Sequence, residues 1–156
     1  DILLESRKDI KTHDEAPEMR AEEIANKAIE EIKNGTDFIF INFANPDMIG
    51  HTGNVSAIKR ALTFVDAQLK RVVSALDDAG GIAFITADHG NAEINIDPDT
   101  GKIHTAHTTS LVPAIITDEA IEFLQGSLVD VAPTVLALFD LPKPIEMTGK
   151  NLIIYE

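Results

Sequence analysis

Two stretches of the chain carry apolar residues at helical spacing. In residues 17–33 they recur every three or four positions, which predicts an amphipathic helix. Asn34-Gly35 would end this helix, because glycine suits the left-handed position after a last turn. Residues 58–76 show the same spacing more clearly, with alternating steps of four and three. Asn54 or Ser56 can cap the start of this second helix.

Apolar runs that lie between the helical stretches predict strands. Residues 38–43 and 82–86 are apolar without alternation, as expected for strands that are covered on both faces. A third strand is predicted over residues 111–117, where Pro113 favours an edge or a strand start, and residues 152–155 could add an edge strand. Helices that alternate with buried strands indicate an α/β fold, a three-layer sandwich around a mostly parallel sheet.

The remaining segments are shorter. Residues 97–101, Asp-Pro-Asp-Thr-Gly, form a strong turn signal that predicts a hairpin tip or loop apex. A short helix is expected over residues 118–124, and another over 131–139 with Pro133 tolerated in its first turn. Residues 1–16 are polar and irregular and do not resemble the natural start of a protein.

Composition narrows the class of protein. The 156 residues are 44% hydrophobic, which is enough for one core and predicts one domain. The net charge of −13 argues against a nucleic-acid partner or an anionic membrane. Cysteine is absent, which excludes disulfides and thiolate metal sites. With no secretion signal recognisable, a cytoplasmic protein is expected.

Polar motifs follow two of the predicted strands. Asp47 and His51 come after the first of these strands, and a helical turn there would place both side chains on one face. Asp88 and His89 follow the second, and Gly90 permits the turn that would let them converge. Ligands in open parallel sheets bind beyond the carboxyl ends of the strands, where these pairs lie.

Two further histidines, His104 and His107, lie in a threonine-rich loop. Four of the five histidines therefore fall near an aspartate or another histidine, and such mixed ligands suit Mn²⁺, Zn²⁺ and related ions. Each pair alone could be a capping aspartate beside a surface histidine, but their co-occurrence favours a site for two metal ions. One of His104 and His107 is expected to be an outer-shell donor or a solvated residue rather than a ligand.

The motifs alone leave the reaction open. Two ions ~3.5–4 Å apart typically hold the attacking and leaving oxygens of a phosphoryl transfer. Ser56 and Ser110 lie near the motifs, yet neither has the context of an activated nucleophile. No catalytic nucleophile is therefore identified in this chain.

At greater length the motifs strongly resemble cofactor-independent phosphoglycerate mutase, the 2,3-bisphosphoglycerate-independent enzyme of the alkaline phosphatase superfamily. The resemblance covers essentially the whole chain. The stretches that carry it are residues 17–19, 42–53, 86–93, 104–108, 128–134 and 147–150.

The resemblance implies a role for each residue of the motifs. Asp47, His51 and His107 correspond to the ligands of one divalent ion, and Asp88 and His89 to ligands of a second. The ions would be Mn²⁺, with Mg²⁺, Co²⁺ or Zn²⁺ as alternatives. His104 is left as the outer-shell candidate.

The resemblance also implies that this chain is a fragment, the C-terminal segment of the metal-binding, phosphatase-like domain. The N-terminal part of that domain and an inserted phosphotransferase domain would carry the nucleophilic serine and an arginine-rich pocket. The intact enzyme, expected to be monomeric, would interconvert 3-phosphoglycerate and 2-phosphoglycerate through a phosphoserine in glycolysis and gluconeogenesis. Another phosphomutase or phosphatase of the superfamily, or a stand-alone domain that binds metal or a partner, are the alternatives.

Overall fold

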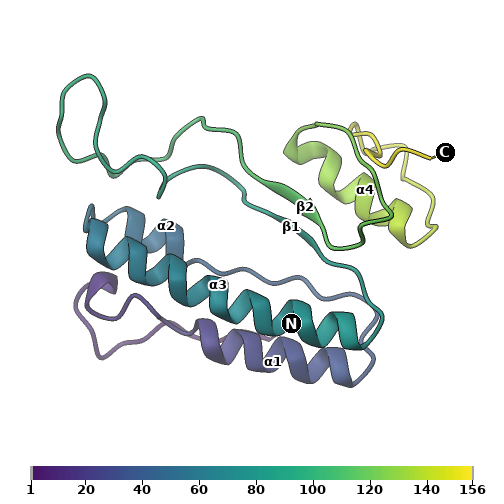
Figure 1. The fold of residues 1–156 in the computed structure, drawn as a ribbon, viewed down its shortest axis with the longest axis horizontal. Helices are drawn as coiled ribbons and strands as arrows, with labels where there is room; N and C mark the ends of the chain where they lie inside the picture. Colours follow the sequence, from purple (N-terminus) through teal and green to yellow (C-terminus); the bar gives the residue numbers. More distant parts are fainter. Residues whose placement is uncertain (1, 156) are drawn as a thin grey trace. The chain divides into compact units, whose positions relative to one another are not determined.

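The computed structural model describes residues 2–155, which divide into two compact units. The first unit runs up to Gly81 and resumes with His89–Val112. The second consists of Ile82–Asp88 and the chain from Pro113 onward. The helices and strands are drawn in Figure 1. None of the helices in the described part is long and apolar enough to cross a bilayer.

The first unit is built on two long helices that lie side by side, α1 (Ala21–Lys33) and α3 (Val55–Asp78) (Figure 1). Both predicted helices are thus confirmed, α1 beginning later than the apolar pattern suggested. Small side chains on α1 allow close approach, and Ala25, Ala28 and Ile32 are buried with Val72 of α3 in one cluster. Asn54 is the N-cap of α3, since its side chain accepts a hydrogen bond from the amide of residue 57, at 3.2 Å.

A short helix, α2 (Asn45–Gly50), packs on the start of α3. Its fully buried Ile49 lies in a second cluster with Ile58 and two alanines of α3. Asn45 holds the other end of α2, because its buried amide donates to the carbonyls of Pro17 at 2.8 Å and Glu18 at 2.9 Å. These contacts fix the direction of α2, and with it the side chains that α2 presents.

The prediction of a strand covered on both faces at residues 38–43 is wrong within the described chain. The segment belongs to no β-ladder among these residues. Three alternate side chains pack against the α1–α3 cluster, namely those of Ile39, Ile41 and Phe43. The alternate residues face outward, Phe38 with 58% and Phe40 with 82% of its surface exposed. The apolar run therefore has one packed face and one exposed face.

The second unit contains the only sheet in the described residues, two strands of three residues each. The strands β1 (Phe84–Thr86) and β2 (Ala114–Ile116) are antiparallel, with Ile85 opposite Ile115. The expected mostly parallel, three-layer arrangement is thus not found in the part of the chain that is described, whereas the α/β class holds. The reason is that a parallel ladder needs a further strand, and the only ladder among the described residues joins β1 to β2.

The end of the chain is organised around one carboxylate. Asp130, buried at the start of α4 (Val131–Leu138), accepts hydrogen bonds from the amides of Lys150 and Ser127 at 2.8 Å each and from the Ser127 hydroxyl. These donors lower the pKa of Asp130. The carboxylate thereby joins the turn before α4 to the last residues.

The short helix expected over residues 118–124 is not formed. Phe123 instead makes an isolated antiparallel bridge with Ile153, so the last segment contributes a bridge where an edge strand was expected. Pairing across the second unit thus overrides the weak helical signal, while the helix expected over residues 131–139 is confirmed as α4.

The exposed phenylalanines lead to a prediction about association. We expect the 156-residue chain to self-associate as salt rises, because Phe40 is 82% exposed and the net charge of −13 repels copies only until salt screens it, over about 8 Å at physiological ionic strength. Sedimentation velocity across a sodium chloride series measures this. Phe40→Ser should reduce association more than Ile145→Ser, which removes an even more exposed apolar side chain elsewhere. A strictly monomeric chain at high salt would contradict the prediction.

Candidate metal centre

Helix α2 brings the first two predicted ligands together. Asp47 lies in its first turn and His51 caps its end, so the two side chains are four residues apart on one face. The distance between Asp47 Oδ1 and His51 Nε2 is 3.2 Å. The expected convergence of this pair is therefore present in the structure.

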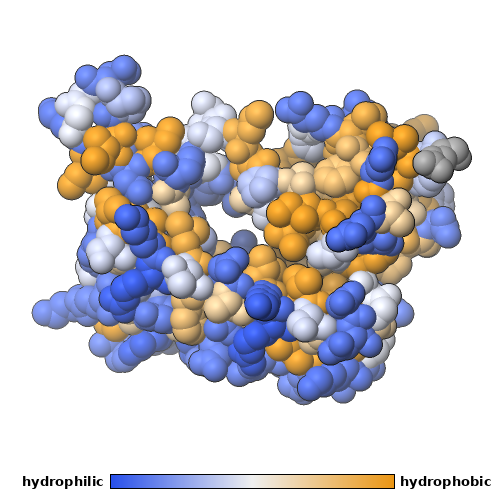
Figure 2. Space-filling view, in the orientation of Figure 1, coloured by the Kyte–Doolittle hydropathy of each residue, from blue (hydrophilic) through white to orange (hydrophobic). Residues whose placement is uncertain are grey.

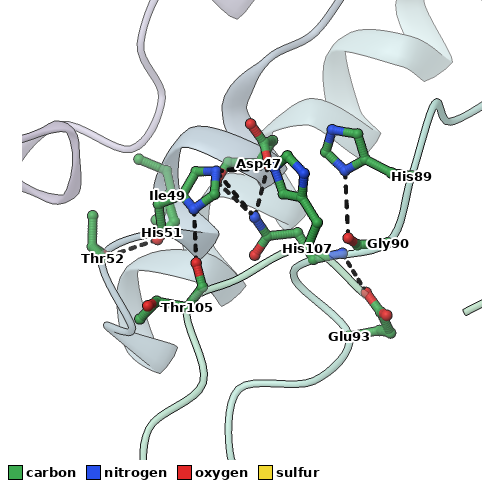
Figure 3. A network of polar contacts seen from close by, with 10 residues as sticks. Asp47, Ile49, His51, Thr52, His89, Gly90, Glu93, Thr105 and His107 are labelled. Carbon is green, nitrogen blue, oxygen red and sulfur yellow. Dashed lines mark hydrogen bonds and ion pairs between the residues drawn. The ribbon is translucent and has the colours of Figure 1, made fainter. Parts of the chain in front are cut away.

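The third donor arrives from the histidine-rich loop. The amide of Thr108 donates to the carbonyl of Gly90 at 2.8 Å, in an isolated antiparallel bridge that places the neighbouring His107. His107 Nε2 lies 3.2 Å from Asp47 Oδ1 and 3.2 Å from His51 Nε2. These three residues form the one group of potential metal ligands found among the described residues, and Figure 3 shows their side chains facing one another.

A backbone carbonyl sets the proton position on one of these imidazoles. His51 Nδ1 lies 2.7 Å from the carbonyl oxygen of Thr105, which can only accept a hydrogen bond. Nδ1 therefore carries the hydrogen of the neutral ring, and Nε2 presents a lone pair toward Asp47 and His107. A cation bound between Asp47 Oδ1, His51 Nε2 and His107 Nε2 would be stabilised by all three atoms.

The three potential ligand atoms, called donors below, fit a divalent ion. Donors ~2.0–2.2 Å from a common ion lie about 2.8–3.6 Å apart, depending on the coordination number. The three observed separations, all 3.2 Å, fall within that range. Two imidazole nitrogens and one carboxylate oxygen suit Mn²⁺, Co²⁺ or Zn²⁺ better than Ca²⁺. Both imidazoles are exposed on one side, so solvent or substrate can reach the site.

A buried asparagine supports the aspartate. Asn91, 5% exposed, donates from Nδ2 to Asp47 Oδ1 at 2.7 Å. Gly50 makes this approach possible, because a Cβ there would lie 2.2 Å from Asn91 Oδ1. Asn91 was not among the residues selected from the sequence, although it lies within the Asp-His-Gly-Asn-Ala-Glu stretch that carried the resemblance.

Glu93 was also missed, and it joins two loops beside the site. One carboxylate oxygen accepts from the amide of Asn91 at 2.7 Å, and the other accepts from the hydroxyl of Thr108. The Thr108 hydroxyl is the main cause that lowers the pKa of Glu93 to about 2, with further donors that include Ser110. Glu93 is therefore ionised at neutral pH and acts only as an acceptor.

His89 lies beside the three ligands without belonging to their group. His89 stacks on His107 with ring centroids 3.8 Å apart and an interplanar angle of 21°, and its Nδ1 lies 3.4 Å from the Gly90 carbonyl. Asp88 belongs to the second unit. A second ion at Asp88 and His89 stays a prediction.

The outer-shell candidate lies in a hairpin. The turn predicted at residues 97–101 is present, with Ile96 bridged to Ile103. His104 donates its backbone amide to the carbonyl of Asn95 at 3.0 Å, and its buried Nδ1 has no hydrogen-bond partner in the described chain. Both isoleucines are more than half exposed, and Figure 2 shows apolar residues at the surface of this hairpin. The outer-shell role of His104 stays a prediction.

Comparison with known proteins decides the family. The sequence profile of the metalloenzyme superfamily matches residues 2–143. This chain belongs to the metalloenzyme superfamily. Membership agrees with the divalent donor set that Asp47, His51 and His107 form.

Two similar curated relatives are both named 2,3-bisphosphoglycerate-independent phosphoglycerate mutase. The protein of Dinoroseobacter shibae is 50% identical over 146 residues, which is 92% of this chain and 29% of the relative. That of Coxiella burnetii is 51% identical over 155 residues, covering 97% of this chain and 30% of the relative. The chain thus spans about 30% of the length of the curated relatives it matches.

A solved structure gives the same result for the fold. The phosphoglycerate mutase of Leishmania mexicana, crystallised at low cobalt concentration, is 29% identical with a TM-score of 0.88, covering 98% of this chain and 31% of that chain. The predicted resemblance to cofactor-independent phosphoglycerate mutase is thereby confirmed.

Proposed function

We propose that this chain is the metal-binding, C-terminal segment of a cofactor-independent phosphoglycerate mutase. In the intact protein it would take part in converting 3-phosphoglycerate to 2-phosphoglycerate through a phosphoserine. The observation that carries the proposal is the convergence of Asp47, His51 and His107, at 3.2 Å from one another, in a chain about 50% identical to mutases of that name.

We assign one Mn²⁺-class ion to these three residues. A second ion would be held by Asp88 and His89 with donors from outside the chain. Ions of this class neutralise phosphoryl oxygens and favour the deprotonated form of a hydroxyl nucleophile. Mn²⁺ is the ion we favour, with Co²⁺, Mg²⁺ and Zn²⁺ as alternatives.

The chain's own residues prepare the site for this chemistry. The Thr105 carbonyl accepts a hydrogen bond from His51 Nδ1, so that Nε2 is the nitrogen of the neutral ring that can bind an ion. Asn91 holds Asp47 Oδ1 in place by a 2.7 Å hydrogen bond. Orientation of this kind lowers the reorganisation that the site needs when charge develops on the substrate.

The rest of the enzyme is proposed to lie outside this chain. It would supply the nucleophilic serine, the arginine-rich substrate pocket and the strands that complete a parallel, three-layer sheet beside residues 38–43. The exposed Phe40 supports this, because a flanking segment there would bury it. We expect the intact enzyme to be cytoplasmic and monomeric, and to bind neither nucleic acid nor membrane.

The proposal is tested by assaying the complete gene product that contains this chain. With Mn²⁺ it is expected to convert 3-phosphoglycerate to 2-phosphoglycerate, and Asp47→Asn should lower the rate by more than the roughly 10–100-fold that loss of an outer-shell partner causes. The 156-residue chain alone should show no turnover, because it offers no activated serine. Glu146→Ala, which removes a charge from the second unit, is the matched control.

Two results would overturn the proposal. Turnover by the rigorously purified 156-residue chain would show that the nucleophile had been misplaced. A complete gene product that prefers phosphopentoses or generic phosphate esters to 3-phosphoglycerate would instead indicate another phosphomutase or phosphatase.

A further inference from the structure

Glu93 makes contacts that the proposed metal site does not use. We propose that Glu93 is a positioning residue for the metal centre: its carboxylate holds the loop of His107 and the loop of Asn91 in the register that makes the three donors converge. The inference rests on the proposed function, since it concerns the same site. Glu93 itself would touch neither ion nor substrate.

The two oxygens of Glu93 reach the neighbours of the donors rather than the donors themselves. One accepts from the amide of Asn91, whose side chain donates to Asp47. The other accepts from the hydroxyl of Thr108, the residue directly after His107. A single carboxylate is thus linked to two of the three donors, each through one intermediate residue.

Local backbone geometry shows that this carboxylate occupies a defined place. A Cβ at Gly90 would lie 2.5 Å from Glu93 Oε1 and 2.2 Å from Thr108 Oγ1, so glycine leaves the room that the pair needs. The 2.8 Å hydrogen bond between the Thr108 amide and the Gly90 carbonyl already joins the loops. The hairpin adds a second backbone link, from the His104 amide to the carbonyl of Asn95 at 3.0 Å. Neither backbone bond reaches the Asn91 amide, and the two bonds of Glu93 tie that amide to the Thr108 side chain beside His107.

The two hydrogen bonds of Glu93 require an ionised carboxylate or, as its closest neutral substitute, the amide of glutamine. Both partners are hydrogen-bond donors, and an ionised carboxylate accepts from both at once. Glutamine keeps one acceptor for the Asn91 amide and turns an N–H toward Thr108, whose hydroxyl can accept it. Alanine keeps neither bond. The order of effects, alanine large and glutamine small, is therefore a signature of positioning.

The test measures Mn²⁺ affinity by calorimetry in the complete gene product that contains this chain. Glu93→Ala is expected to weaken Mn²⁺ binding by roughly 10–100-fold, the usual effect of losing an outer-shell partner of a metal ligand. Glu93→Gln should restore most of the affinity. The visible spectrum of the Co²⁺-loaded protein should change in Glu93→Ala and match the unaltered protein in Glu93→Gln. Glu146→Ala should change neither reading.

A second pair of variants covers the case in which Glu93→Ala unfolds. Thr108→Val removes one of the two hydrogen bonds and should weaken Mn²⁺ binding, whereas Thr108→Ser keeps the hydroxyl and should not. Equal Mn²⁺ affinity in the unaltered protein, Glu93→Ala and Thr108→Val would overturn the role of Glu93 and leave the metal site standing. Absence of Mn²⁺ binding in the unaltered protein would overturn both.

Discussion

Replacing His107 with alanine is expected to weaken Mn²⁺ binding by more than about 100-fold, beyond the usual effect of losing an outer-shell partner. His107 Nε2 lies 3.2 Å from both other donors, so its loss leaves the ion with two protein ligands. His104→Ala should leave the affinity nearly unchanged, because His104 is held in the hairpin by its backbone and no contact joins it to the triad in the described residues.

The two variants control for each other. Both remove one imidazole from the same loop, so changes in net charge and in loop composition are matched. Calorimetric titration with Mn²⁺ gives the two affinities directly. Equal losses would mean that the loop places the other histidine at the ion, and a larger loss in His104→Ala would reverse the assignment.

The ligand pair on α2 could be predicted because its geometry is local. A spacing of four residues places Asp47 and His51 on one face of any helical turn, whatever surrounds it. The choice between His104 and His107 depends on tertiary structure, namely the pairing of Thr108 with Gly90. Sequence spacing carries no information on that pairing, which is why the motifs alone left the choice open.

The supporting residues were missed for a related reason. Asn91 matters because Gly50 leaves room for it beside Asp47, which lies 44 positions earlier in the sequence. Glu93 matters because it accepts a hydrogen bond from the Thr108 hydroxyl. Asparagine is not a usual ligand of these ions, and Glu93, although glutamate often binds metals, stands in no pair with a histidine. The adjoining Asp-His-Gly was the only local signal that they lay near a site.

The fold was predictable where periodicity is strong and misleading where it is weak. Helices α1 and α3 follow from long amphipathic patterns, and the turn at residues 97–101 follows from its own residues. An apolar run such as residues 38–43 shows that a segment seeks burial but does not identify what covers it. Here α1 and α3 cover one face, and Phe40 on the other remains exposed.

Gly50→Ala is expected to damage the site without touching a ligand. The new Cβ would lie 2.2 Å from Asn91 Oδ1 and 2.7 Å from its Cγ, and Asn91, 5% exposed, has little room to move. Asn91 would have to leave its 2.7 Å hydrogen bond with Asp47. We expect a loss of about 1–3 kcal/mol in the free energy of unfolding, as for other overpacked sites, and a roughly 10–100-fold loss of Mn²⁺ affinity.

Two control variants separate these effects. Gly80→Ala meets no atom within 4 Å but has a φ of 72°, so it should lower stability through backbone strain and leave Mn²⁺ binding unchanged.

Asn91→Ala removes the atoms that the new Cβ of Gly50→Ala would contact. The double variant should therefore be no less stable than Asn91→Ala alone, while its Mn²⁺ affinity stays low, since the bond to Asp47 is absent in both. Thermal unfolding and calorimetric titration measure the two quantities. Stability losses that simply add in the double variant would show that the contact between Gly50 and Asn91 is not the cause.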